Sequence, residues 1–301
     1  MARPELSGPF LFCLTLSGFF WHEAGMRVPT FNPDSSLVAE VVPSPNHGER
    51  VGDRLPDMIL LHYTGMPEPQ GALEWMCSPE SKVSAHYYVF EDGRIIQCVP
   101  EKLRAWHAGD SFWANDTDIN SCSIGIEIAN PGHDHNYADF PARQIAAVTA
   151  LCRGIAQRRL IPAERVLAHS DVAPGRKKDP GEKFPWRILH NSGVGYWVES
   201  LPIVPGPNFT VGDRGKVITS FQLLLAEYGY RVPVEGEFDT ATRDAVMAFQ
   251  RHFRPARVDG VVDSSTLMTL QLLIDSRRSK PRPQPEPQTA GFQLDEELFR
   301  P

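Results

Sequence analysis

Short apolar runs of strand length alternate with one longer amphipathic segment in the first two thirds of the chain, and this alternation restricts the fold most strongly. Residues 58–61 (MILL) and 165–168 (RVLA) have the length and composition of buried strands, and each run ends at a histidine. Residues 122–128 (CSIGIEI) alternate in polarity as a strand does. Residues 142–157 place apolar side chains at helical spacing. Strands that alternate with helices predict an α/β domain with a mixed β-sheet flanked by helices.

Residues 84–100 are predicted to form a β-hairpin. The β-rich runs HYYVF and RIIQCVP flank the sequence Glu91-Asp92-Gly93, and Asp-Gly is a strong signal for a tight turn. The hairpin therefore adds antiparallel pairing to a sheet that is otherwise expected to be built through helical connections.

A proline-rich stretch at residues 201–210 (LPIVPGPNFT) is expected to link this half to a second, small all-α domain. Three apolar stripes at helical spacing follow it. SFQ at 220–222 and AFQ at 248–250 each precede an acidic-Gly-x-x-Asp-x-x-Thr turn, which predicts two related halves. The expected divisions are an N-terminal segment 1–37, the α/β domain 38–200, the linker 201–210, the helical domain 211–275 and a disordered or extended Pro-rich tail 276–301.

The N-terminal segment permits two interpretations. Residues 9–21 are apolar over about the length of a signal-peptide core, which is too short to span a bilayer, so no integral membrane segment is expected. Glu5 and the lack of a clean A-x-A site weaken the export reading, and Met26 offers a second start. A targeting segment and an over-extended start both stay open.

The net charge of −7 argues against nucleic acid as the main partner, because a phosphate-binding protein usually presents a basic face. The five cysteines are odd in number and irregularly spaced, so they imply no disulfide framework. Free or buried thiols are the simpler interpretation.

Three residues stand where a metal site can be built. His62 and His169 each follow an apolar strand, and Asp179 lies ten residues later in a Gly/Pro-rich loop (HSDVAPGRKKDPG). Two imidazoles and one carboxylate suit Zn²⁺ and leave a fourth position open for water. The spacing alone leaves the choice open, because a single histidine at a strand end is often structural.

Three sequence blocks carry a family resemblance: LHYT at 61–64, SIGIE at 123–127 and AHSDVAPGRKKDPG at 168–181. In this order they resemble the signature of the N-acetylmuramoyl-L-alanine amidases of the AmpD/AmiD type, which share a fold with peptidoglycan recognition proteins. The likeness spans roughly residues 38–200. It implies that His62, His169 and Asp179 bind one zinc ion, and that Glu127 and Lys177 are catalytic.

The resemblance also implies a reaction. Zinc lowers the pKa of a bound water to about 7, which makes a nucleophile for the lactyl carbonyl of N-acetylmuramic acid. Glu127 would move the proton to the leaving nitrogen of L-alanine, and Lys177 would stabilise the oxyanion. Without the resemblance, a surface or paired strand carboxylate is the favoured interpretation of Glu127, and a solvated loop lysine is the alternative for Lys177. His86 and His107 lie in family-like stretches and are expected to contact or orient the substrate, with packed structural histidines as the alternative.

Several other side chains are weaker candidates. Asp171 is expected to act as a hydrogen-bond partner of the candidate ligand His169. Trp106 and Trp113 are candidates for a sugar groove, although buried aromatic residues are more common. His133 and His135 stand in an exposed polar loop that is suited at most to adventitious metal.

Residues 212–274 resemble the peptidoglycan-binding module of wall hydrolases, most clearly in GEFDTATRDAVMAFQ. The resemblances together predict hydrolysis of the muramoyl–L-alanine amide in peptidoglycan or muropeptides. A binding protein without activity and a zinc hydrolase of another amide are the alternatives, and the complete set of five site residues favours catalysis. The module favours the cell envelope or periplasm, and the unpaired cysteines leave the cytoplasm open. The sequence does not indicate an oligomeric state.

Overall fold

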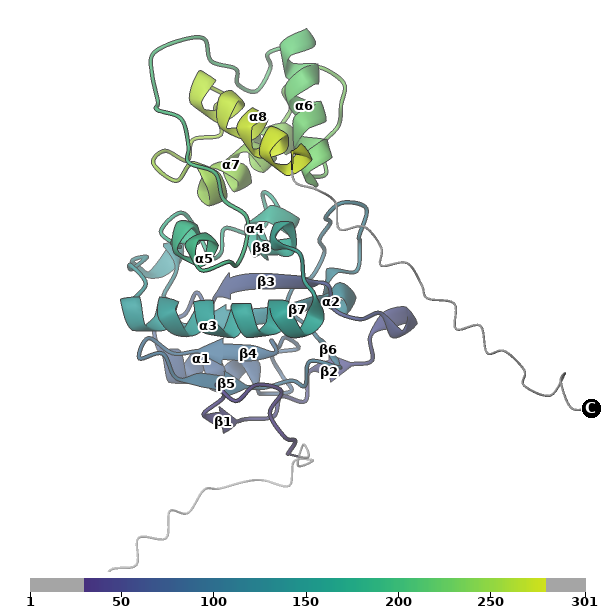
Figure 1. Cartoon of the computed structure of the whole chain (residues 1–301), viewed down its shortest axis with the longest axis vertical. Coiled ribbons are helices and arrows are strands. Elements are labelled where there is room, and N and C mark those ends of the chain that lie inside the picture. The colour runs from purple at the N-terminus through teal and green to yellow at the C-terminus, as the bar shows by residue number, and fades with distance from the viewer. Residues whose placement is uncertain (1–29, 280–301) are drawn as a thin grey trace, which may run out of the picture.

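The computed structural model describes residues 30–279, and its first domain is built on a mixed β-sheet (Figure 1). Within these residues the sheet has six strands, in the spatial order β1 (Glu40–Val41), β5 (Ile95–Gln97), β4 (Tyr87–Val89), β7 (Ser123–Ile128), β3 (Met58–Tyr63) and β8 (Val166–Ala168). Strands β4, β7, β3 and β8 are parallel, and β5 is antiparallel to β4. Strands β2 (His47–Gly48) and β6 (Arg104–Ala105) form a separate antiparallel pair. The predicted mixed sheet is thus confirmed.

Helices cover the sheet and form the second domain. In residues 30–279 they are α1 (Pro69–Met76), α2 (Ile119–Cys122), α3 (Ala142–Arg159), α4 (His169–Val172), α5 (Trp186–Asn191), α6 (Lys216–Tyr228), α7 (Thr240–Phe253) and α8 (Ser264–Arg278). Short 3₁₀ turns lie at Val51–Asp53, His133–His135 and Ala163–Arg165. No helix in this part of the chain combines the length and apolarity needed to cross a bilayer. The apolar run at 9–21, Met26 and the tail from residue 280 lie outside the described residues.

Two local predictions differ from the structure at their ends. Helix α3 runs to Arg159, two residues past the predicted end, and Leu160 caps it in the left-handed conformation (φ 54°). Helix α8 ends at Arg278, beyond the expected boundary at 275. The hairpin forms as predicted: β4 and β5 pair antiparallel, and Gly93 adopts the positive φ of 88° that its turn requires.

The two faces of the sheet have different roles because side chains alternate along each strand. On β3, Ile59 and Leu61 point to the face that α3 covers, where they pack in one apolar cluster with α3 residues such as Val148. Met58 and Leu60 point to the opposite face and pack in another cluster. His62 follows the same alternation as Met58 and Leu60. The His62 side chain at the end of β3 therefore points away from α3.

The sequence repeat in the helical domain corresponds to a repeated hydrogen-bond pattern. Gln222 donates to the carbonyl of Glu237 and accepts from the amide of Gly236, at 2.8 and 3.0 Å. Gln250 donates to the carbonyl of Val261 and accepts from the amide of Gly260, both at 2.9 Å. Each glutamine thereby braces the acidic-Gly turn that follows it, and this satisfies buried backbone groups of the turn.

The helical domain is docked on the α/β domain. One continuous apolar cluster joins Met58 and Leu60 of β3 to Phe221 and Phe249 of the helical domain. Figure 1 shows the three helices stacked above α4 and α5. Buried polar contacts of Asp171 reinforce the junction. Asp171 accepts hydrogen bonds from the hydroxyl of Tyr230 at 2.7 Å and from the amide of Ala168 at 2.9 Å. Its other contact across the junction is with Nδ1 of His252, at 2.7 Å. The stretch 201–210 therefore connects two domains that share a core.

Candidate metal centre and active-site cavity

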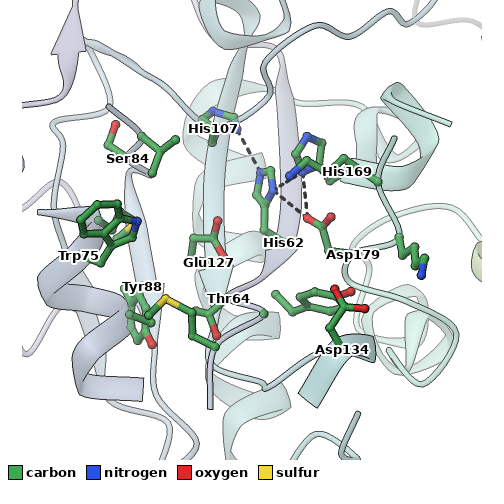
Figure 2. A pocket seen from close by; sticks show the side chains of 18 of the residues that line it. His62, Thr64, Trp75, Ser84, Tyr88, His107, Glu127, Asp134, His169 and Asp179 are labelled. Atoms are coloured by element: carbon green, nitrogen blue, oxygen red, sulfur yellow. Dashed lines mark hydrogen bonds and ion pairs between the residues drawn. The ribbon is translucent and has the colours of Figure 1, made fainter. Parts of the chain in front are cut away.

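A row of polar side chains crosses the ends of three parallel strands. In the strand register, Glu127 of β7 pairs with His62 of β3 on one side and with Tyr88 of β4 on the other. Paired residues on parallel strands project from the same face, so all three line one cavity of about 380 Å³. His169, directly after β8, and Asp179 line the same cavity (Figure 2).

His62, His169 and Asp179 converge on one point. Nδ1 of His62 lies 2.9 Å from Nδ1 of His169 and 3.1 Å from Oδ2 of Asp179, and the third side of the triangle measures 2.9 Å. All three residues are buried. Among residues 30–279 they form the single group of three or more His, Cys, Asp or Glu side chains placed to hold a metal ion.

The protonation of these groups tests whether a cation fits. Nε2 of His169 lies 2.9 Å from the carbonyl oxygen of Ala108, which only accepts, so Nε2 carries the proton and Nδ1 a lone pair. Burial, assisted by the charge of the neighbouring His169, lowers the pKa of His62 to about 4, so this ring is neutral at pH 7. Burial opposes ionisation of Asp179, but its pKa is lowered overall, so the carboxyl group is ionised at neutral pH. Lone pairs of three buried groups thus face one point. These lone pairs repel one another unless a cation lies between them, and the donor set suits zinc.

Glu127 has an unused acceptor beside this point. Its Oε2 is buried and has no hydrogen-bond partner among the described residues. Burial raises the pKa of Glu127 well above its usual range, the charge of Asp179 adds to the effect, and Lys177 counteracts it. Figure 2 shows the carboxyl group on the strand next to His62, open to the cavity. A carboxyl group in this setting can exchange a proton with a molecule bound in the cavity.

The loop between His169 and Asp179 brings positive charge to the cavity. Arg176, Lys177 and Lys178 all line it. Arg176 is fixed by hydrogen bonds to the carbonyls of Ala108 and Asp110, each at 2.6 Å. The charge of Lys177 lowers the pKa of Glu127 and of His62, which places this lysine electrostatically close to the row of polar side chains.

His86 and His107 occupy different positions. His86 is 0% exposed and is not among the residues that line the cavity. Its Nδ1 accepts from the amide of Gly125 at 3.0 Å, and its Nε2 lies 3.0 Å from the carbonyl of Leu103. This placement supports the structural alternative for His86 and not substrate contact. His107 does line the cavity, and its Nδ1 lies 3.1 Å from Nε2 of His62.

The weaker candidates are held by protein contacts. Asp171 caps α4 and joins the domains, whereas the outer nitrogen of His169 faces Ala108. Trp113 is 2% exposed and packs against Tyr228 and Tyr230, so it lines no groove. His133 is positioned by Tyr63 and Glu182, at 2.9 and 3.1 Å. Trp106 is partly buried and is not among the cavity residues. The four cysteines in residues 30–279 are free.

Trp75 is an aromatic residue of the cavity that the sequence motifs do not indicate. Trp75 lines the cavity and is 50% exposed, although it lies on α1, whose buried positions are Ala72, Leu73 and Met76. A tryptophan outside the apolar stripe of a helix was the available signal, because tryptophan is enriched at binding interfaces.

Comparison with known families assigns both domains. Residues 52–182 match the family model described as N-acetylmuramoyl-L-alanine amidase. Residues 214–270 match a family model for a peptidoglycan binding domain. The two matches fall on the α/β domain and on the helical domain, in the order that the sequence resemblances imply.

Individual relatives agree with this assignment. The chain is 36% identical over 234 residues to the N-acetylmuramoyl-L-alanine amidase AmiD of Escherichia coli, covering 72% of this chain and 82% of AmiD. It resembles the structure of AmiD in complex with anhydro-N-acetylmuramic acid-L-Ala-D-γ-Glu-L-Lys, with a TM-score of 0.63, 33% identity and coverage of 75% and 91%. It also resembles AmpDH3 of Pseudomonas aeruginosa, with a TM-score of 0.61, 28% identity and coverage of 84% and 100%. The chain therefore belongs to the family of N-acetylmuramoyl-L-alanine amidases, which are hydrolytic enzymes, and it carries a C-terminal peptidoglycan-binding domain.

Proposed function

We propose that this protein is a zinc enzyme that hydrolyses the amide between the lactyl group of N-acetylmuramic acid and L-alanine in peptidoglycan. His62, His169 and Asp179 would hold one zinc ion. The observation that carries the proposal is the unpartnered Oε2 of Glu127, one strand away from three converging metal-type donors. A protein that only recognised peptidoglycan would have no need for a buried carboxyl group of raised pKa at this place.

When bound, zinc supplies an acidified water and a Lewis acid for the scissile carbonyl. Glu127 accepts one proton from the attacking water while the water oxygen bonds to the lactyl carbonyl carbon. Glu127 then gives this proton to the alanine nitrogen as the C–N bond breaks. The products are a lactyl carboxylic acid, which loses the second water proton to solvent at neutral pH, and a peptide with a free amino terminus. Lys177 stabilises the negative charge that develops on the carbonyl oxygen.

The docked helical domain supports polymeric peptidoglycan as the substrate. Its family match is to a peptidoglycan binding domain, and the apolar core that it shares with the α/β domain holds it at a fixed position relative to the cavity. Wall bound by this domain would keep scissile bonds at a high local concentration. The same argument supports the cell envelope as the site of action. A soluble muropeptide and a cytoplasmic location form the alternative.

The test is incubation of the purified protein with polymeric peptidoglycan and, separately, with a soluble muropeptide, followed by mass spectrometry of the products. We expect stem peptides with an L-alanine amino terminus, lost with a chelator and restored by zinc. Release from the soluble muropeptide alone would refute the polymer preference. No release from either substrate by zinc-loaded protein would favour the binding-protein alternative.

A further inference from the structure

Two consecutive residues, His107 and Ala108, contact the outer nitrogens of both imidazoles of the candidate metal centre. We propose that this 107–108 segment is a positioning element that fixes the tautomer and orientation of His62 and His169, so that both present Nδ1 to the metal. The inference rests on the proposed zinc site. In this proposal His107 positions His62 and does not contact the substrate.

The contact with His62 can be followed to a backbone carbonyl. The Ser123 hydroxyl donates to the carbonyl of Ile119 at 2.6 Å, so its oxygen is left as an acceptor. Nε2 of His107 lies 3.4 Å from that oxygen and is therefore the protonated nitrogen of the ring. Nδ1 of His107 then carries a lone pair, and it accepts from Nε2 of His62 at 3.1 Å. The proton of His62 is thereby held on Nε2, and Nδ1 is free to bind a metal.

The contact with His169 reaches the same result through the backbone. Nε2 of His169 lies 2.9 Å from the carbonyl oxygen of Ala108, which has no proton to give. The same oxygen accepts from Arg176 at 2.6 Å, which anchors the carbonyl from the side of the basic loop. One dipeptide thus orients both histidines, with a side chain for one and a carbonyl for the other.

The 107–108 segment is itself fixed by Asn120 and by the shape of β7. Oδ1 of Asn120 accepts from the amides of His107 and Ala108 at 3.0 and 2.8 Å, and the Asn120 side chain is buried. Gly125 leaves room for the imidazole of His107, because a Cβ there would lie 2.6 Å from the ring. The buried side-chain amide of Asn120 therefore positions the groups that hydrogen-bond to both candidate ligands. Loss of a hydrogen-bond partner of a metal-binding histidine typically changes metal affinity by about 10–100-fold.

The experiment measures the zinc dissociation constant by competition with a chromophoric chelator, for the full-length protein and four variants. His107→Leu removes the acceptor for His62, whereas His107→Asn places a carboxamide oxygen close to the position of Nδ1. Asn120→Ala releases the 107–108 segment. His190→Asn is the matched control, because the ring of His190 also bonds a backbone carbonyl, that of Gly195 at 3.2 Å, without touching the candidate ligands.

We expect His107→Leu and Asn120→Ala to bind zinc about 10–100-fold more weakly, with His107→Asn closer to the unchanged protein and His190→Asn equal to it. Histidine ¹⁵N NMR should assign Nε2–H to His62 and His169 in the unchanged protein and a mixture for His62 in His107→Leu. Equal zinc affinity in all variants would overturn the inference, as would a raised KM in His107→Leu at unchanged zinc affinity. Absence of zinc binding by the unchanged protein would instead refute the proposed metal centre.

Discussion

Glu127 and His62 lie opposite each other in the register of the parallel strands β7 and β3, and both face the same cavity. The carboxyl group that is proposed to move the proton is therefore fixed beside a proposed metal ligand by backbone hydrogen bonds of the sheet. Strand pairing places these groups more rigidly than a loop would.

Replacement of Glu127 by glutamine should remove proton transfer while keeping the shape of the side chain. We expect amide hydrolysis to fall by about 10²–10⁴-fold, the usual contribution of a general acid–base group. Peptide release followed by mass spectrometry measures the loss. Zinc affinity should stay near that of the unchanged protein, and a large drop in affinity would show that Glu127 acts on the metal centre and not on the proton.

Zinc should stabilise the fold through the three converging side chains. Zinc at a concentration 100-fold above its dissociation constant should add about 2.7 kcal/mol to the free energy of unfolding. Thermal unfolding with and without a chelator measures this difference. Asp179→Asn should abolish it, whereas His135→Ala, at an exposed histidine, should not. Equal stabilisation of the Asp179→Asn variant would point to a metal site elsewhere.

Lys177 and Lys178 are adjacent residues of the cavity and form a natural pair for comparison. Lys177 lowers the pKa of Glu127, so its charge acts close to the reaction site. We expect Lys177→Met to lower kcat by at least about tenfold, because an oxyanion donor acts mainly in the transition state. Lys178→Met should change kcat much less. Similar effects of the two substitutions on KM alone would assign both lysines to substrate attraction.

The buried contact between Tyr230 and Asp171 ties the helical domain to the element that carries His169. Tyr230→Phe leaves one carboxylate oxygen of Asp171 without this donor, which should cost about 1–3 kcal/mol of unfolding free energy. Urea unfolding measures the change. Because the two domains share one apolar cluster, we expect a single cooperative transition. Two separate transitions would contradict a shared core.

Acidification should destabilise the protein through Asp116. Burial alone would raise the pKa of this carboxyl group, but hydrogen bonds from Arg54 and Arg165, at 2.6 and 3.0 Å, lower it overall. A folded-state pKa below the unfolded value of about 3.9 gives stability that is fully present above that pH. The contribution is lost as the pH falls through the folded-state pKa. Urea unfolding between pH 6 and pH 3 should show a weaker pH dependence for Asp116→Asn, and an unchanged slope would contradict the assignment.

Local patterns in the sequence were sufficient for the elements that depend on near neighbours. The apolar runs, the Asp-Gly turn and the helical stripes are properties of adjacent residues, and the corresponding strands, hairpin and helices formed within a few residues of their predicted ends. The candidate zinc ligands and Glu127 were identified because their motifs resemble a known family. Their binding of zinc and their catalytic roles stay predictions.

The relations between distant segments were decided only by the tertiary structure. His86 and His107 stand in equally family-like stretches, yet the His86 ring does not line the cavity, whereas the His107 ring lines it and faces His62. Sheet pairing and the hydrogen bonds that Asn120 of α2 accepts from the amides of residues 107 and 108 set these directions, and neither leaves a local signal. The Pro-rich stretch 201–210 indicated a linker, but the apolar surface available on the sheet decided that the domains dock. The sequence thus determined which segments bury apolar surface, and the packing of those surfaces determined which polar groups meet. The physical reason is that the hydrophobic effect has no preferred direction, whereas hydrogen bonds require a specific distance and angle.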